Sequence, residues 1–487
     1  MKNIKYIFCT LLLTVFTLVT FNQCGDFDDI NEDPNAPTQP DTRYLFVHAA
    51  RFARDFHIWQ TYDAYQLFYP QYISELLNVQ YTDFSGTTFA LSRYYTTPLK
   101  NINEIIRLNE DEAWKNTGYV VSFTSNSNQM AIMRTFRAWI FMHLTDITGM
   151  IPYSEAIKGK DGNYTPKYDT QESIYTDLFK ELNEAYLQFN VNDPFPGSAY
   201  DIFYKGNVDS WKRFNASVRM QLAIKLFKRD ETKGKTEFAK AYGEGFIQEN
   251  NQSFTFKYDM NTPHPLYDNM QTRNDFQPSK TIVDMLKSYN DPRITEYMEP
   301  NIYGQYVGMP FGLSKSDAAK WSIDTVCQFK PKYYERTATA YLTTPSIMYF
   351  AAAEAAERGW ITANAEDLYK LGIQRSLEQH GFTATDFTAY YAQPDIAYTG
   401  TTTDKINKIG VQKWLASYMQ DMIEAWSDWR RLGAPDLKTG PNSLVQNIPR
   451  RRMYDSGDYN ANMDNYKAAV AAQGPDTRET RVWWDME

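Results

Sequence analysis

The fold is decided most clearly by residues 344–380, which read TPSIMYFAAAEAAERGWITANAEDLYKLGIQRSLEQH. Helical spacing of apolar residues runs from Ser346 to Gly359, and it resumes over residues 364–380. A short turn after Trp360 joins the two runs. The pattern predicts a helical hairpin close in length to a tetratricopeptide unit, although the consensus of that repeat is degraded.

Apolar residues recur at helical spacing on both sides of this hairpin. The predicted helices span residues 41–79, 94–112, 128–148, 171–190, 210–229 and 405–432. Pro70 should kink or end the first of them, and Asp209 is expected to cap the helix at 210–229. In the last helix, Trp414, Tyr418, Met422 and Trp426 recur every four residues, a stripe typical of a core, before Gly433 ends it.

The helical pattern is interrupted in two places. Residues 80–92 are polar and predict a loop. Residues 250–340 are rich in Pro, Gly, Asn and Tyr, and their helical runs are short. A long irregular stretch in a large domain is usually functional or disordered, and the aromatic residues argue against disorder here. We therefore predict an all-α fold with an irregular, loop-rich lobe at about 250–340.

The first 42 residues predict export and anchoring. A basic start, an apolar core and Cys24 form a lipoprotein signal at residues 1–23, although Phe21-Asn22-Gln23 is a poor match before the cysteine. Five acidic residues follow between Asp26 and Asp33, so residues 24–42 predict a solvated tether. Acylation of Cys24 would hold the chain at a membrane without spanning it. The alternatives are an ordinary signal peptide and an uncleaved helix.

Composition limits the function of the remaining domain, residues 43–487. The net charge of the full chain, -9, argues against nucleic acid as a partner, and no apolar run after residue 23 approaches the ~20 residues of a membrane span. The five His residues have no ligand spacing, so we predict no metal and no cofactor. Only Cys327 is left for the exported chain, so packing rather than disulfides must hold the core.

Aromatic residues are abundant, with 36 Tyr, 29 Phe and 11 Trp. Tyr and Trp combine a flat apolar face with a polar edge, which suits them to stack on sugar rings. This composition favours a glycan-binding protein. The alternative is that these side chains fill the spaces between helices.

Short motifs distributed along the chain resemble those of one family. They are Cys24–Asn35, Leu144–Ala156, Pro166–Asp169, Trp211–Ser217, Asn290–Arg293, Ala353–Trp360, Gln412–Trp414, Trp429–Pro435 and Ile448–Arg451. Each motif is weak alone, but the ordered set resembles the SusD/RagB-like nutrient-binding lipoproteins of the Bacteroidetes outer membrane. The chain departs from the family pattern after the arginine pair, where Asp455 follows Tyr454 and Asp458 stands in place of the usual Glu.

The resemblance implies a helical scaffold of four tetratricopeptide-like helix pairs and an irregular lobe that carries ligand contacts. It also implies a non-catalytic protein that faces the cell exterior and caps a SusC-like TonB-dependent transporter, to which it passes glycans or peptides. Ligand residues vary within the family, so no site carries over by motif. The motifs themselves, including Asp146, Pro152 and Trp211, are expected to serve the scaffold.

We expect ligand contacts in two irregular regions, where aromatic rings would stack on sugars while amide and guanidinium groups donate hydrogen bonds. The candidates are Tyr81, Phe84, Tyr94 and Tyr95 after the early helices, and Tyr267, Arg273, Asn274, Tyr303, Tyr306, Phe311 and Trp321 in the lobe. The alternative for each is packing.

Three functions compete. The first is the binding module of a nutrient importer, with an oligo- or polysaccharide preferred over a peptide. The second is a surface glycoside hydrolase, which needs two carboxylates about 5–10 Å apart, but no local catalytic motif supports it. The third is an adhesin or scaffold that holds another protein with its helical hairpins.

Overall fold

The computed structural model describes residues 39–56, 68–77, 79–86 and 88–487. The chain divides after Asp41, and the domain considered below begins at Thr42. The predicted signal at residues 1–23, the acylated Cys24, most of the tether and part of the first predicted helix lie outside the described residues.

The domain is built mainly from helices that pack in pairs: α2 with α4, α6 with α7, α8 with α9, α14 with α15, and α17 with α18. Their bounds are α2 Thr42–Ala50, α4 Lys100–Glu110, α6 Asn126–Thr148, α7 Gln171–Gln188, α8 Val208–Ile224, α9 Glu231–Glu244, α14 Pro345–Glu357, α15 Ala365–Gln379, α17 Thr402–Ala416 and α18 Met422–Leu432. The hairpin predicted at 344–380 is the pair α14 and α15. This arrangement confirms the predicted all-α class.

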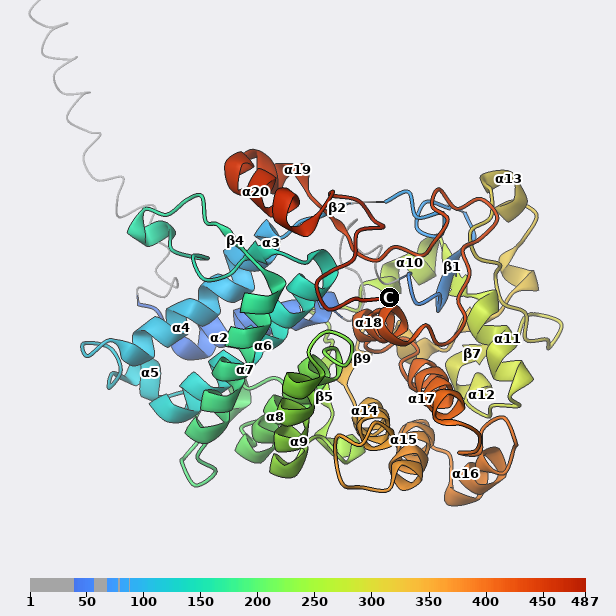
Figure 1. The fold of residues 1–487 in the computed structure, drawn as a ribbon, viewed down its shortest axis with the longest axis horizontal. Helices are drawn as coiled ribbons and strands as arrows, with labels where there is room; N and C mark the ends of the chain where they lie inside the picture. The colour runs from blue at the N-terminus through green and yellow to red at the C-terminus, as the bar shows by residue number, and fades with distance from the viewer. Residues whose placement is uncertain (1–38, 57–67, 78, 87) are drawn as a thin grey trace, which may run out of the picture. The chain divides into compact units, whose positions relative to one another are not determined.

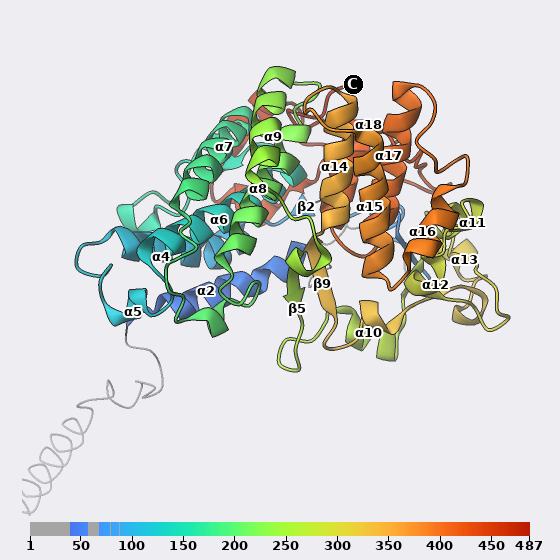
Figure 2. The same ribbon diagram turned by 90° about the horizontal axis from the view of Figure 1, so that it is seen from below.

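Neighbouring helix pairs also pack against one another. Helix α8 packs against both α7 and α14, so the green helices α6–α9 and the orange helices α14–α17 stand side by side in Figure 2. A glycine in the sequence allows two of these helices to approach closely. A Cβ on Gly372 of α15 would lie 2.7 Å from the Phe350 ring of α14, so the two helices could not pack this tightly with a larger residue there.

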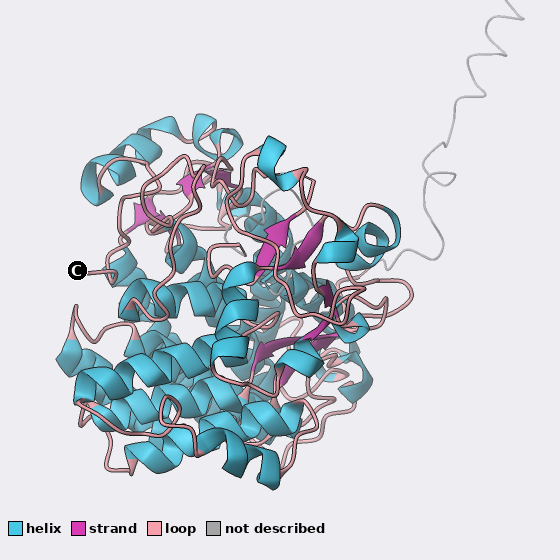
Figure 3. Ribbon diagram, turned by 90° about the vertical axis from the view of Figure 1, so that its right-hand side faces the viewer, coloured by secondary structure: helices cyan, strands magenta, loops and turns pink. Residues whose placement is uncertain are grey.

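Short strands and helices fill the segments between the pairs, and Figure 3 shows the strands in small separate groups. The strand pairs are β1 Ile73–Glu75 with β6 Phe276–Pro278, β2 Thr88–Phe89 with β10 Met453–Tyr454, β3 Ile151–Pro152 with β4 Tyr168–Asp169, β5 Phe254–Lys257 with β9 Thr339–Thr343, and β7 Met298–Glu299 with β8 Gln328–Phe329. All of them are antiparallel except the β2–β10 pair. That parallel pair brings the loop after the early helices beside the C-terminal region (Figure 1).

The remaining elements are short. The helices are α3 Ser92–Tyr94, α5 Gly118–Val121, α10 Leu266–Thr272, α11 Lys280–Ser288, α12 Ile294–Tyr297, α13 Lys315–Ala318, α16 Ala384–Tyr391, α19 Ser456–Asn460 and α20 Met463–Gln473. The single turns are η1 Arg51–Phe56, the π-helical η3 Tyr95–Leu99, η4 Gly159–Asp161, η5 Ser198–Tyr200, η6 Asn250–Gln252, η7 Ile323–Thr325 and η8 Pro331–Tyr333. Residues 250–340 thus contain short elements only, as predicted.

The core contains charged groups as well as apolar ones. Lys225, the residue that follows α8, lies 2.7 Å from the carboxylates of both Asp146 and Glu424, and all three side chains are buried. Nearby, Glu354 of α14 pairs with Arg431 of α18 at 2.6 Å. Buried charges are tolerated only when they are paired, and these pairs join helices that are far apart in sequence.

Three predictions about helices are wrong. The stretch 405–432 is two helices, because Met419 adopts a φ of 53° and Asp421 caps α18 by accepting the Glu424 N–H at 3.1 Å. Residues 68–70 form a turn, Gln71 has a φ of 62°, and the chain continues into β1, so residues 68–77 are not helical, in line with the break expected at Pro70. Helix α8 is capped by Asn207, two residues before the expected Asp209.

In the described part of the chain, no helix combines the length and apolar character needed to cross a bilayer.

Candidate functional site

A cavity of about 1080 Å³ lies among three segments of the domain. One wall comes from α3, η3 and α4, the second from the loop between β3 and β4, and the third from the segment around α19. The lining residues are Leu45, Leu91, Ser92, Tyr95, Thr96, Lys100, Asn101, Asn103, Glu104, Arg107, Pro152, Ala156, Ile157, Gly159, Lys160, Asp161, Asn163, Tyr164, Pro166, Tyr168, Asp455, Gly457, Asp458, Ala461 and Asn462. We refer to it as the main cavity.

The helical wall runs continuously from Ser92 to Glu110 through a π-helical turn at η3. Pro98 lies inside this turn and lacks an N–H, so it donates no intrahelical hydrogen bond, and the wider turn gives room to its ring. The turn places Tyr95 at the cavity, where its hydroxyl donates to the Pro152 carbonyl at 2.5 Å. Burial raises the pKa of Tyr95 well above its ordinary value, so the hydroxyl stays protonated.

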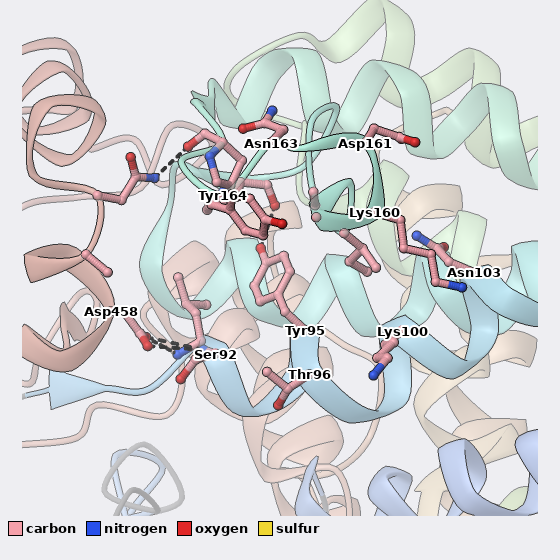
Figure 4. A pocket seen from close by; sticks show the side chains of 18 of the residues that line it. Ser92, Tyr95, Thr96, Lys100, Asn103, Lys160, Asp161, Asn163, Tyr164 and Asp458 are labelled. Carbon is pink, nitrogen blue, oxygen red and sulfur yellow. Dashed lines mark hydrogen bonds between the residues drawn. The ribbon is translucent and has the colours of Figure 1, made fainter.

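Asp458 joins the C-terminal wall to the helical wall. Its carboxylate accepts the backbone N–H groups of Leu91 at 2.5 Å and Ser92 at 3.3 Å, which are the first groups of α3 (Figure 4). A carboxylate at a helix N-terminus satisfies donors that have no partner within the helix. Asp458 is the residue that stands in place of the usual Glu after the arginine pair. This departure from the family pattern therefore lies at a residue that shapes the cavity.

The loop over the cavity is fastened at its C-terminal end. Asn462 donates from its amide to the Pro166 carbonyl at 2.6 Å, and Asn465 donates to the Thr165 carbonyl at 2.8 Å. The loop reverses direction at Ile157, with a φ of 61°, and at Gly162, with a φ of 82°. These anchors hold the short segment that carries Tyr164.

Tyr164 is the most exposed aromatic residue at the cavity, with 78% of its surface accessible. It approaches Gly159, where a Cβ would lie 3.6 Å from its ring. In Figure 4, Tyr164 comes from the upper loop and Tyr95 from the helix below. Two tyrosines therefore face the same space from opposite walls, one largely exposed and one hydrogen-bonded.

Most charges around the cavity are already paired. Arg107 donates to both Glu104 oxygens at 2.8 and 3.2 Å, and Lys160 lies 3.1 Å from the same carboxylate. The hydrogen bonds from Arg107 lower the pKa of Glu104. Lys100 and Asp161 are the lining charges whose side chains bond to none of the described residues. The cavity thus offers one free charge of each sign beside amides and tyrosines, a lining suited to a neutral polar ligand.

Four of the residues predicted to contact ligand have side chains that are buried in the core. Tyr81 stacks on Phe68 at 4.8 Å, and Tyr94 stacks on Phe89 at 5.6 Å. Phe84 and Phe311, predicted from separate regions, meet at 5.7 Å and are almost inaccessible to solvent. Packing accounts for these rings, and ligand contact at them stays a prediction. Tyr95 is the predicted residue that lines the main cavity.

The other predicted contacts are spread over the lobe. Tyr267 lies under the Arg336 guanidinium at 5.1 Å, Arg273 pairs with Asp275 at 2.8 Å, and Asn274 donates to Gln328 at 3.1 Å. Tyr306 and Trp321 are half-buried, whereas Tyr303 is 68% exposed at a loop tip. Apart from Tyr95, none of the predicted residues lines the main cavity.

Tyr164, Lys100 and the Asn side chains of the main cavity were missed by sequence reasoning. The signal at Tyr164 was a single large aromatic residue in the otherwise polar stretch 159–167. The local sequence of residues 455–462 did not indicate that they would line the cavity, because their position there depends on contacts with residues more than 290 positions away.

Among the residues that the structure describes, no group of three or more His, Cys, Asp or Glu side chains is arranged to hold a metal ion. The one Cys in that part of the chain, Cys327, is buried, and its sulfur accepts the Val307 N–H at 3.1 Å.

Comparisons with known proteins agree with the helical fold. A model of the SusD-like family, described as starch-binding and associating with the outer membrane, matches residues 34–455. No curated protein matches the chain. Among solved structures, a SusD homologue from Bacteroides uniformis is 24% identical with a TM-score of 0.78, over 91% of this chain and 99% of that one. A chitin-binding SusD homologue from Flavobacterium johnsoniae is 24% identical with a TM-score of 0.74, over 92% of this chain and 99% of that one.

Proposed function

The chain belongs to the SusD-like family of starch-binding proteins that associate with the outer membrane, and from this premise we propose that its main cavity binds an oligo- or polysaccharide. In this proposal the protein is anchored through Cys24, faces the cell exterior, and delivers the glycan to a SusC-like TonB-dependent transporter. It acts by binding and not by catalysis.

The observation that carries the glycan assignment is the exposed ring of Tyr164 above a cavity lined by amides and paired charges. Sugar rings present apolar C–H faces and a rim of hydroxyl groups. An aromatic face matches the first and amide groups match the second. The side-chain N–H₂ of Asn103 and the side-chain oxygen of Asn163 bond to none of the described residues, so both are available to hydroxyls.

A peptide is the second candidate, and one observation favours it. Lys100 and Asp161 are the two lining charges with no partner among the described residues, and they are of opposite sign. A peptide would satisfy them with a carboxylate and an ammonium group, whereas a neutral glycan would leave both hydrated.

The test uses the soluble chain that begins at Gly25. We would measure its retention on affinity gels containing starch or chitin, and its calorimetric titration with glucose oligomers, N-acetylglucosamine oligomers and peptide mixtures. The supernatants would be analysed for cleavage products. Binding of a glycan without products supports the proposal. Binding of peptides alone would assign the peptide alternative, and products that disappear when one acid is mutated would assign an enzyme.

Tyr164→Ala locates the site. We expect it to weaken glycan binding about tenfold, because the loss of one aromatic contact of about 1.4 kcal/mol corresponds to that factor. The matched control is Tyr303→Ala, since Tyr303 is a similarly exposed tyrosine at a loop tip outside the cavity. An unchanged affinity for Tyr164→Ala together with a loss for Tyr303→Ala would move the site to the lobe predicted from sequence.

A further inference from the structure

A second, smaller cavity of about 490 Å³ lies at the end of α18. Its walls come from Trp429, from the loop that contains Thr439, Gln446 and Asn447, and from the C-terminal segment that contains Arg481. It shares no lining residue with the main cavity. We refer to it as the Trp429 cavity.

Trp429 differs from the tryptophan one turn before it. Trp426 is fully buried, and its indole N–H donates to the Pro449 carbonyl at 2.9 Å. Trp429 is only half-buried, it lines the cavity, and its N–H donates to none of the described residues. A partly accessible indole with an available donor combines an apolar surface with a polar edge.

The charged groups behind Trp429 are fixed by one another. The Arg450 guanidinium lies 5.2 Å from the Trp429 ring, donates to Asp485 at 2.7 Å and to the Arg430 carbonyl at 2.6 Å. Arg481 donates to the same Asp485 carboxylate at 3.0 Å and lies 3.6 Å from Glu487. Because these cations have carboxylate partners, this wall is rigid and offers little net charge to an anionic ligand.

The lining of the Trp429 cavity also includes free amides. Gln446 and Asn447 are exposed, and their side chains bond to none of the described residues. Thr439 adds a hydroxyl that donates to the Gln446 carbonyl at 3.3 Å. An indole beside two free amides and a hydroxyl offers the same recognition chemistry as the main cavity, with Trp in place of Tyr.

The two cavities are close along the chain. Arg450 lines the Trp429 cavity and Asp455 lines the main cavity, only five residues later. Five residues of extended chain span at most about 18 Å. The backbones of Arg450 and Asp455, one lining residue from each cavity, are therefore no more than this distance apart.

We propose that the Trp429 cavity is a second carbohydrate subsite, which stacks a neutral sugar unit on Trp429 and engages the same glycan chain as the main cavity. The inference rests on the proposed glycan binding of the main cavity. Two linked subsites raise affinity for a long chain through effective concentration, while a short oligosaccharide occupies one subsite at a time.

The test compares long and short ligands with the chain from Gly25 onward. The probes are starch and chitin on affinity gels, and the trimers of glucose and N-acetylglucosamine in calorimetry. We expect Trp429→Ala to weaken polymer binding at least about tenfold through the loss of bivalency. The affinity of the Trp429→Ala variant for the trimer, which the main cavity still binds, is expected to stay within about twofold of the wild-type value. Gln446→Ala with Asn447→Ala is the second variant, because these exposed side chains can be removed without opening the core.

Leu444→Ala is the matched control, since Leu444 is 65% exposed in the same loop but does not line the cavity. Thermal melting verifies that each variant is folded. The second subsite is overturned if the wild type, Trp429→Ala and the Gln446/Asn447 double variant all bind the polymer equally well. The proposed glycan binding by the main cavity would still stand in that case. If the wild type binds neither polymer nor trimer, the proposed function fails and the second subsite fails with it.

Discussion

At the scale of single residues, exposure separates tyrosines and phenylalanines that sequence alone treats alike. Phe84 and Tyr164 both lie in irregular segments rich in polar residues. Phe84 is fully buried against Tyr69 and Phe311, whereas Tyr164 is 78% exposed at the main cavity. Their substitutions should therefore affect different properties of the protein.

Phe84→Ala is expected to cost about 3–5 kcal/mol in the free energy of unfolding, because it removes a buried ring and leaves a cavity. Tyr303→Ala, at an exposed position, should change that free energy by no more than about 0.5 kcal/mol. Urea denaturation of both variants measures the difference. Equal stability of the two variants would contradict the placement of Phe84 in the core.

At the scale of elements, buried ion pairs join helices that are distant in the chain. Glu354 of α14 accepts hydrogen bonds from Arg431 of α18 and lies 2.8 Å from Arg358. Burial alone would raise the pKa of Glu354, but the attraction of Arg431 outweighs it, and the pKa lies below its ordinary value of 4.5.

Glu354→Gln is expected to destabilise the domain by about 3 kcal/mol at pH 7, because it removes the charge of one of the two carboxylates that pair with the buried Arg431 and leaves only Asp428, at 2.8 Å. Glu366→Gln on α15 is the control. Its pair with Lys370 is exposed and contributes at most about 1 kcal/mol. Urea denaturation of both variants gives the comparison, and similar losses in the two would contradict the proposed role of the buried pair.

The same pair predicts a pH dependence. Since the folded pKa of Glu354 is lowered, its contribution to stability is present above pH 4.5 and is lost as the pH falls through the folded value. The wild type should therefore lose more stability than Glu354→Gln when the pH is lowered below 4.5. Urea denaturation at pH 7 and pH 4 measures this, and parallel losses in the two proteins would refute the assignment.

The elements also show what periodicity can predict. Helices α6, α7, α14 and α15 agree with the predicted ranges to within a few residues, because long amphipathic or apolar runs determine them locally. The break between α17 and α18 was missed, since residues 417–421 contain no Gly or Pro and the apolar stripe continues through them. Only the tertiary packing of Tyr418 and Met419 in the core reveals it.

At the scale of the whole molecule, the family and the fold were predictable but the main cavity was not. Ordered motifs spread over the chain indicated the SusD-like family, which the match over residues 34–455 confirms. The cavity depends on Asp458 reaching Leu91 and on Asn462 reaching Pro166. Contacts over such sequence distances leave no periodic signal, so Tyr164 could be recognised only after the walls were assembled.

The most direct test of the account is a crystal structure of the soluble chain soaked with an oligosaccharide that it binds in calorimetry. We expect electron density for sugar rings in the main cavity, with one ring against Tyr164 and hydroxyls near Asn103 and Asn163. Density confined to the lobe beside Tyr303 and Trp321, with an empty main cavity, would contradict the account.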